Sequence, residues 1–198
     1  GEHYWNSAVS LGNSPAQSYS KTHLVPFGEF IPPGFSWFLR LVSIPMSSFS
    51  RGPEMQAPLA VAGQHVAVNI CYEDAFGEEI IRALPQAGML ANLSNTAWFG
   101  RSLAQPQHLQ IARMRAVETG RPMLRATNTG MTAVIAADGS LQAVLPPFTQ
   151  GVLKAEVHAR QGMTPYARYG NSVSLLLAGL CLLASQLPRR RLAAPVRP

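Results

Sequence analysis

The chain has 198 residues, 47% hydrophobic and 13% charged, which suffices for one substantial core and gives no reason to expect two. Its net charge is +6, but four of these charges come from Arg189 to Arg191 and Arg197. The other basic residues are scattered without a basic, aromatic-rich stripe, so no nucleic-acid partner is expected. The two cysteines, Cys71 and Cys181, have no metal-ligand spacing, so no metal site is predicted.

The N-terminal part predicts two short strands, one within residues 1–12 and one over Tyr19–Val25. Residues 27–58 then hold many prolines, glycines, serines and aromatics, and this stretch is too long and too apolar for an ordinary solvent loop. It is either a loop packed on its own core or a lid or membrane-dipping arm. The cluster of large apolar groups favours the arm, and it includes Phe35, Trp37 and Phe38.

Strands and helices then alternate. The predicted order is strand His65–Ile70, helix Gly77–Leu84, strand Met89–Leu93, helix Gln107–Thr119 and strand Pro122–Ala126. A hairpin follows, with Asp138-Gly139 as its turn, and then a last strand over Val152–Val157. Alternation closed by a hairpin predicts a mixed sheet in a sandwich of the α/β class.

The C-terminal stretch Ser172–Leu187 contains no charge and is mostly leucine and alanine. Its sixteen residues are few beside the roughly 20 that span a bilayer. Tyr166 and Tyr169 precede it as interfacial anchors, and three arginines follow it at once. A buried C-terminal helix is the alternative, but it leaves the arginines unexplained, so we expect a transmembrane helix over residues 170–188.

This expectation sets a topology. The positive-inside rule places the basic tail, residues 189–198, in the cytoplasm and the domain formed by residues 1–165 on the other side of the membrane. A domain outside the membrane needs an export signal, and residues 1–10 are neither a signal peptide nor a membrane helix. We therefore expect this sequence to be the C-terminal part of a longer membrane protein.

Cys71 is the candidate nucleophile, because an apolar strand ends at it and polar residues follow at once, as where a sheet presents a thiol at a sharp corner. A thiol with a pKa near 8.5 needs a base or a cation to react at neutral pH. Lys21 and Glu29, eight residues apart, could meet Cys71 at the rim of the sheet. Taken singly, each residue has a more common structural explanation. Lys21 would be a surface charge, Glu29 a loop carboxylate and Cys71 a buried small residue.

Three segments, KTHLVPFGEF, CYEDAF and NLSNTAWFG, resemble the nitrilase superfamily of carbon–nitrogen hydrolases, and in particular its apolipoprotein N-acyltransferase branch. The resemblance extends over nearly all of residues 4–172. It implies a partial nitrilase-like α-β-β-α sandwich followed by one C-terminal transmembrane helix. The motifs HLVPFGEF and SNTAWFG are specific for the acyltransferase branch.

The resemblance also implies roles for individual residues, because the family uses a Glu-Lys-Cys triad. Cys71 matches the nucleophile, and Lys21 matches the triad lysine, which also stabilises an oxyanion. Glu29 and Glu73 match supporting acids, and the backbone N–H of Tyr72 matches an oxyanion donor. The triad glutamate belongs upstream of Lys21, where Glu2 stands in a different motif, so we expect the general base to lie outside this sequence.

The implied reaction uses no cofactor. Cys71 takes a fatty acyl group from a phospholipid as a thioester and passes it to the N-terminal amine of a diacylglyceryl-cysteine apolipoprotein, at the periplasmic side of the bacterial inner membrane. Two alternatives remain, a nitrilase-type amidohydrolase with water as acceptor and a catalytically incomplete membrane-anchored module. Ordinary core packing is the alternative for Trp98. The expected substrate-lining residues are Phe35, Trp37, Phe38, Asn95, Trp98 and Phe99.

Overall fold

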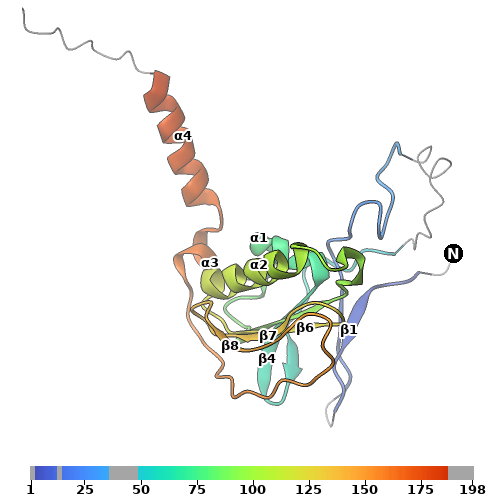
Figure 1. Cartoon of the computed structure of the whole chain (residues 1–198). Helices are drawn as coiled ribbons and strands as arrows, with labels where there is room; N and C mark the ends of the chain where they lie inside the picture. The colour runs from blue at the N-terminus through green and yellow to red at the C-terminus, as the bar shows by residue number, and fades with distance from the viewer. Residues whose placement is uncertain (1–2, 13–14, 36–48, 187–198) are drawn as a thin grey trace, which may run out of the picture.

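The computed structural model of the protein describes residues 3–12, 15–35 and 49–186, and its centre is a six-stranded sheet in which the strands are neighbours in chain order (Figure 1). The strands are β3 (Leu59–Val61), β4 (Gln64–Ile70), β5 (Met89–Ser94), β6 (Met123–Thr127), β7 (Thr132–Ile135) and β8 (Leu141–Leu145). The pairs β4–β5 and β5–β6 are parallel, and the other three pairs are antiparallel. The mixed sheet expected from the sequence is therefore confirmed.

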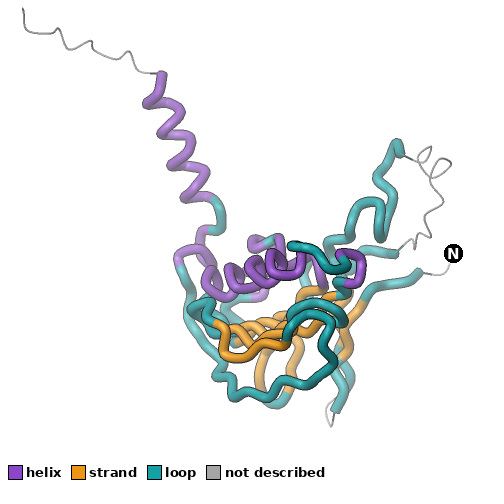
Figure 2. Tube along the Cα trace, in the orientation of Figure 1, coloured by secondary structure: helices purple, strands orange, loops and turns teal. Residues whose placement is uncertain are grey.

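Helices cover one face of this sheet (Figure 2). They are α1 (Gly77–Ile80), α2 (Ala104–Thr119) and α3 (Pro165–Tyr169), while α4 (Ser172–Gln186) extends away from the domain. The α/β class is confirmed. Over the described residues the architecture is one helical layer on one large sheet, beside a two-stranded sheet of β1 (Ser7–Val9) and β2 (Ser18–Ser20).

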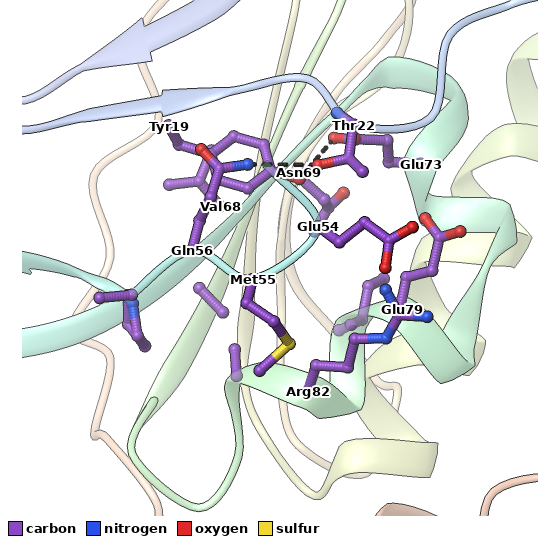
Figure 3. Close-up of a pocket in the computed structure, with 15 residues that line it drawn as sticks. Tyr19, Thr22, Glu54, Met55, Gln56, Val68, Asn69, Glu73, Glu79 and Arg82 are labelled. Atoms are coloured by element: carbon purple, nitrogen blue, oxygen red, sulfur yellow. Dashed lines mark hydrogen bonds between the residues drawn. The ribbon is translucent and has the colours of Figure 1, made fainter. Parts of the chain in front are cut away.

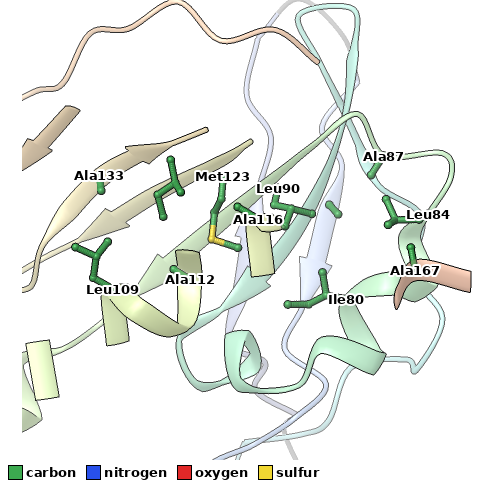
Figure 4. Close-up of a cluster of buried hydrophobic side chains, with 12 residues drawn as sticks. Ile80, Leu84, Ala87, Leu90, Leu109, Ala112, Ala116, Met123, Ala133 and Ala167 are labelled. Atoms are coloured by element: carbon green, nitrogen blue, oxygen red, sulfur yellow. The ribbon is translucent and has the colours of Figure 1, made fainter. Parts of the chain in front are cut away.

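The core lies between the sheet and α2 (Figure 4). The buried face of α2 repeats every three or four residues, as a helix packed on one side requires. Ala112 and Ala116 on this face are fully buried, and their small side chains let the helix axis approach the sheet closely. Leu90, Met123 and Ile135, on the neighbouring strands β5, β6 and β7, belong to the same buried cluster.

Helix α2 begins three residues earlier than the sequence predicts, at Ala104, although Pro106 lies in its first turn. The first turn of a helix has no intrahelical acceptor for its N–H groups, so a proline costs nothing there. The helix ends where expected, because Gly120 takes the left-handed conformation at φ 63° and its N–H caps the last turn.

Two strand predictions need correction. The strand expected over Tyr19–Val25 ends at Ser20, because the N–H groups of Thr22 and His23 donate to the carboxylate of Glu73 instead of to a neighbouring strand. The strand expected over Val152–Val157 is wrong. Residues 150–161 have no strand partner, and Val152 in this stretch is strongly exposed, so its apolar alternation marks no buried sheet face.

The C-terminal prediction is supported only in part. A helix does form over the apolar stretch, as α4, and none of its side chains is buried against the domain. In the segments of the chain that the structure describes, no helix is both long and apolar enough to cross a membrane, so the predicted span has no support here. The basic tail lies outside the described residues.

Candidate active site

Cys71 lies directly after the last residue of β4 and begins a short 3-10 helix, η2 (Cys71–Ala75). Its φ of 53° is in the left-handed region, which a non-glycine residue occupies at a cost of about 1–3 kcal/mol. The turn holds this conformation because its own Glu73 accepts the N–H of Ile70 at 2.7 Å. The side chain of Cys71 is thereby presented at the corner between strand and helix, as the sequence predicts.

The parallel strands bring further residues to the same edge of the sheet. Asn95 follows β5, and Asn128 follows β6. The thiol of Cys71 donates a long hydrogen bond to the backbone carbonyl of Asn95 (3.8 Å). The side-chain amide nitrogen of Asn128 donates to the side-chain oxygen of Asn95 at 2.7 Å. Asn95 therefore lies beside the candidate nucleophile, Cys71.

Lys21 and Glu29 form a salt bridge of 2.7 Å between Nζ and Oε2, and Lys21 is 1% exposed. Glu29 also accepts the N–H of Val25 (2.8 Å) and the amide of Asn6 (3.0 Å). With three donors on one carboxylate, Glu29 is well placed to orient Lys21. Both residues line the same cavity as Cys71.

Opposing effects act on the thiol of Cys71. Burial raises its pKa, and the carboxylates of Asp74 and Glu29 add to this effect. The ammonium of Lys21 and the backbone N–H of Tyr72 act in the other direction, because both stabilise the thiolate. The net effect is a raised pKa, so the thiol needs a proton acceptor to react at neutral pH.

Glu73 lies on the other side of the Cys71 turn, where it lines a small cavity of about 60 Å³ (Figure 3). Its buried carboxylate accepts hydrogen bonds from the Tyr19 hydroxyl and from the N–H groups of Thr22, His23 and Ile70, at 2.6–3.0 Å. Burial raises its pKa, while these donors lower it. Glu73 ties the loop that follows Lys21 to the end of β4, which suits a positioning residue.

The cavity at Cys71 is large, roughly 1100 Å³, and both polar and aromatic residues line it. Phe27, Tyr72, Trp98 and Phe99 are partly or strongly exposed, with 81% of Trp98 accessible. A buried core position is therefore wrong for Trp98. The exposed Phe35 packs its ring edge against Phe27, one of the lining residues, with centroids 5.5 Å apart. The predicted lining residues Trp37 and Phe38 lie outside the described residues.

The structure contains a buried polar network under Cys71 that we did not predict from the sequence. Arg125 of β6 donates to Asp74 (3.0 Å) and to Asn92 (2.6 Å), and its Nη2 lies 2.7 Å from Nδ1 of His108. Asn92 in turn donates to the backbone carbonyl of Cys71 at 3.3 Å. One signal was available in the sequence, since Arg125 interrupts an apolar strand and such a charge needs a buried partner.

The fold and this site together define a class: an α/β protein that presents a cysteine in a cavity shared with a lysine–glutamate pair, at the carboxyl ends of parallel strands. The family model described as carbon–nitrogen hydrolase matches residues 1–166. The chain belongs to the carbon–nitrogen hydrolase family.

The curated relatives are similar over almost the whole chain. A Ralstonia nicotianae protein named apolipoprotein N-acyltransferase is 56% identical over 197 residues, which cover 96% of this chain and 38% of that protein. A Nitrosomonas europaea protein of the same name is 58% identical over 186 residues, covering 93% and 37%. The chain thus spans less than two fifths of the length of these two relatives.

Solved structures share the fold at low sequence identity. A carbon–nitrogen hydrolase from Helicobacter pylori G27 superimposes with a TM-score of 0.57 at 20% identity, covering 75% of this chain and 55% of that one. The NitFhit protein of C. elegans gives 0.53 at 19% identity, covering 73% and 36%. At this level of identity the likeness concerns the fold alone.

Proposed function

We propose that this chain carries the nucleophile-bearing part of an N-acyltransferase that moves a fatty acyl group from a phospholipid to the N-terminal amine of an apolipoprotein. The observation that carries the proposal is the place of Cys71, at a left-handed turn in a roughly 1100 Å³ cavity shared with Lys21 and Glu29. The name shared by the relatives at 56% and 58% identity supports the acyltransferase reading.

In the first half-reaction the thiolate of Cys71 attacks the ester carbonyl of the lipid. The backbone N–H of Tyr72 and the ammonium of Lys21 stabilise the oxyanion that forms. The tetrahedral intermediate collapses to an acyl thioester, and the lysophospholipid leaves after its oxygen takes up a proton. In the second half-reaction the amine of the acceptor attacks the thioester, an amide forms, and the thiol is restored.

Glu29 orients Lys21 in this mechanism, because three hydrogen-bond donors already occupy its carboxylate. Glu73 acts at a distance by fixing the loop beyond Lys21. The proton of the thiol passes to a further carboxylate, which the resemblance to the triad enzymes assigns to a glutamate upstream of Lys21.

The exposed apolar groups of the chain suit lipid substrates. Trp98, Phe99 and Phe27 line the Cys71 cavity and are reachable from solvent, and α4 presents a row of exposed leucines. We place the domain at a membrane surface, with α4 as the membrane-contacting helix, and assign this surface to the periplasmic side of the bacterial inner membrane. A small soluble amide would need neither feature.

The test supplies the purified full-length gene product with a phospholipid and a synthetic peptide that begins with diacylglyceryl-cysteine. The proposal predicts that the peptide gains one acyl chain in amide linkage, that lysophospholipid is released in equal amount, and that Cys71→Ala abolishes both. Rapid hydrolysis of small amides without acylation of the peptide would identify an amidohydrolase instead. Absence of both activities would remove both enzyme readings.

A further inference from the structure

His108 occupies the buried face of α2 and lines the cavity of Cys71, yet the proposed mechanism does not use it. One ring nitrogen, Nδ1, points into the polar network, 2.7 Å from Nη2 of Arg125 and 3.2 Å from Oδ2 of Asp74. The other, Nε2, has no hydrogen-bond partner among the described residues and is not one of the buried unpaired atoms. Since His108 lines the cavity, Nε2 is reachable from it.

The contact with Arg125 fixes the proton on the ring. A guanidinium nitrogen can only donate, so we assign Nδ1 as the acceptor in the shorter contact, at 2.7 Å from Arg125, rather than as a donor to Asp74 at 3.2 Å. An accepting Nδ1 leaves the proton on Nε2, and the ring is neutral. Charge balance agrees, because Asp74 and Arg125 already compensate each other, and a third, positive group would leave the buried network with a net charge.

The same network fixes where the ring stands relative to the nucleophile. Arg125 is held by Asp74 and Asn92 as well as by His108, and Asn92 also binds the carbonyl of Cys71. His108 and Cys71 are thus attached to one buried set of hydrogen bonds, which limits their relative motion. The ring of Phe99 lies 6.1 Å from that of His108 and gives the donor an apolar neighbour.

We propose that His108 is a substrate-binding residue whose Nε2–H donates a hydrogen bond to an oxygen of the acyl donor, either its ester carbonyl or its phosphate. The inference rests on the proposed function and deepens it, because it assigns a polar contact inside a cavity that otherwise suits apolar chains. A neutral, fixed donor binds an acceptor oxygen without adding a charge that would have to be desolvated.

Two substitutions separate the two nitrogens. In His108→Asn the short amide can keep an acceptor for Arg125 but has no group that reaches the position of Nε2. In His108→Gln the amide nitrogen stands near the position of Nε2 and restores the donor. Thioester formation on the full-length gene product is followed against phospholipid concentration, together with the alkylation rate of Cys71 and the melting temperature.

The proposal predicts that His108→Asn raises KM for the phospholipid about 3- to 10-fold, as expected for one lost hydrogen bond, with kcat within about 2-fold. Cys71 alkylation and the melting temperature stay at wild-type values, and His108→Gln recovers most of KM. A p-nitrophenyl acyl ester tells the two oxygens apart: an equal rise in KM assigns the carbonyl, and a rise for the phospholipid alone assigns the phosphate.

An unchanged KM in His108→Asn would overturn the proposal. A fall in Cys71 alkylation that matches the loss of activity would also overturn it, because the histidine would then act only on the structure of the site. If the wild-type enzyme forms no thioester from phospholipid, both the proposed function and this inference are wrong. If the wild type forms the thioester and His108→Asn behaves like it, the inference alone fails.

Discussion

At the scale of single residues, burial opposes the role of nucleophile that we propose for Cys71. Desolvation raises the pKa of its thiol, and the principal opposing effect is the ammonium of Lys21. Lys21 is itself fully buried and forms a 2.7 Å salt bridge with Glu29. Among the effects that stabilise the thiolate, the largest therefore comes from a cation that Glu29 holds in place.

Lys21→Met tests this dependence. Loss of the ammonium removes the largest effect that lowers the thiol pKa, so a higher pH is needed to form the thiolate. We expect the pH profile of Cys71 alkylation by iodoacetamide to move to higher pH than in the wild type. Lys154→Met removes the same charge at an exposed position and leaves the profile in place. Coincident profiles for wild type and Lys21→Met would contradict this reading.

Glu73→Gln tests the positioning role of the second acid. The carboxylate accepts from four donors, three of them backbone N–H groups, and an amide nitrogen would face at least one of them as a second donor. We expect a loss of about 2–3 kcal/mol in the free energy of unfolding, measured by urea denaturation. Glu54→Gln, an exposed site on the same small cavity, changes stability by less than about 0.5 kcal/mol. Equal stabilities of the two variants would contradict the positioning role of Glu73.

At the scale of elements, the loop that carries Lys21 is held from two sides. Glu73 binds the N–H groups after Lys21, and the N–H of Gly52 donates to the carbonyl of Lys21 at 2.9 Å. This close approach requires a glycine at position 52, since an added Cβ would lie 2.1 Å from the carbonyl oxygen of Ser20. A distant segment of the chain thus fixes one end of the lysine loop.

Gly52→Ala is therefore expected to displace the lysine loop. The added methyl group meets backbone, which cannot give way as a side-chain end can, so stability falls by about 1–3 kcal/mol. Thioester formation falls with it, because Lys21 moves relative to Cys71. Gly179→Ala in α4 adds the same group where nothing lies within 4 Å and serves as the control. The two variants are compared by thermal unfolding and by acylation rate, and identical behaviour would exclude the proposed close contact.

The elements also show how far the sequence carries a prediction. Cys71 at the end of β4 and the helix α2 follow from local patterns, a strand before a polar corner and a helix bounded by Gly120. The network of Arg125 and His108 does not, because it joins β6 to α2 through contacts that no local pattern encodes. The same reason explains the early end of β2, where a carboxylate 51 residues away competes for the backbone of Thr22.

At the scale of the whole molecule, α4 extends from a firmly anchored base (Figure 1). Thr164 caps α3 by accepting the N–H of Ala167, and Glu78 of α1 accepts the N–H of Asn171 at 2.9 Å, just before α4 begins. These contacts fix the start of α4 against the α/β domain. A membrane that takes up α4 would therefore also set the distance between its surface and the mouth of the Cys71 cavity.

Replacing Leu176 and Leu180, one turn apart on α4, with lysines tests this arrangement. Each leucine contributes at least about 1.5 kcal/mol when buried in lipid, so we expect vesicle binding of the chain to weaken by about 100-fold. The matched control places lysines at Met114 and Val117, which are exposed apolar residues on α2. Co-sedimentation with phospholipid vesicles measures both, and equal binding of the two double variants would contradict a role for α4 at the membrane.

The covalent intermediate on Cys71 is the central claim, and intact-mass spectrometry tests it most directly. The full-length gene product is incubated with a phospholipid of defined acyl chain and no acceptor. The account predicts one acyl group in place of one thiol hydrogen, discharged by neutral hydroxylamine and absent in Cys71→Ala. Release of lysophospholipid without any adduct, or an adduct that persists in Cys71→Ala, would contradict it.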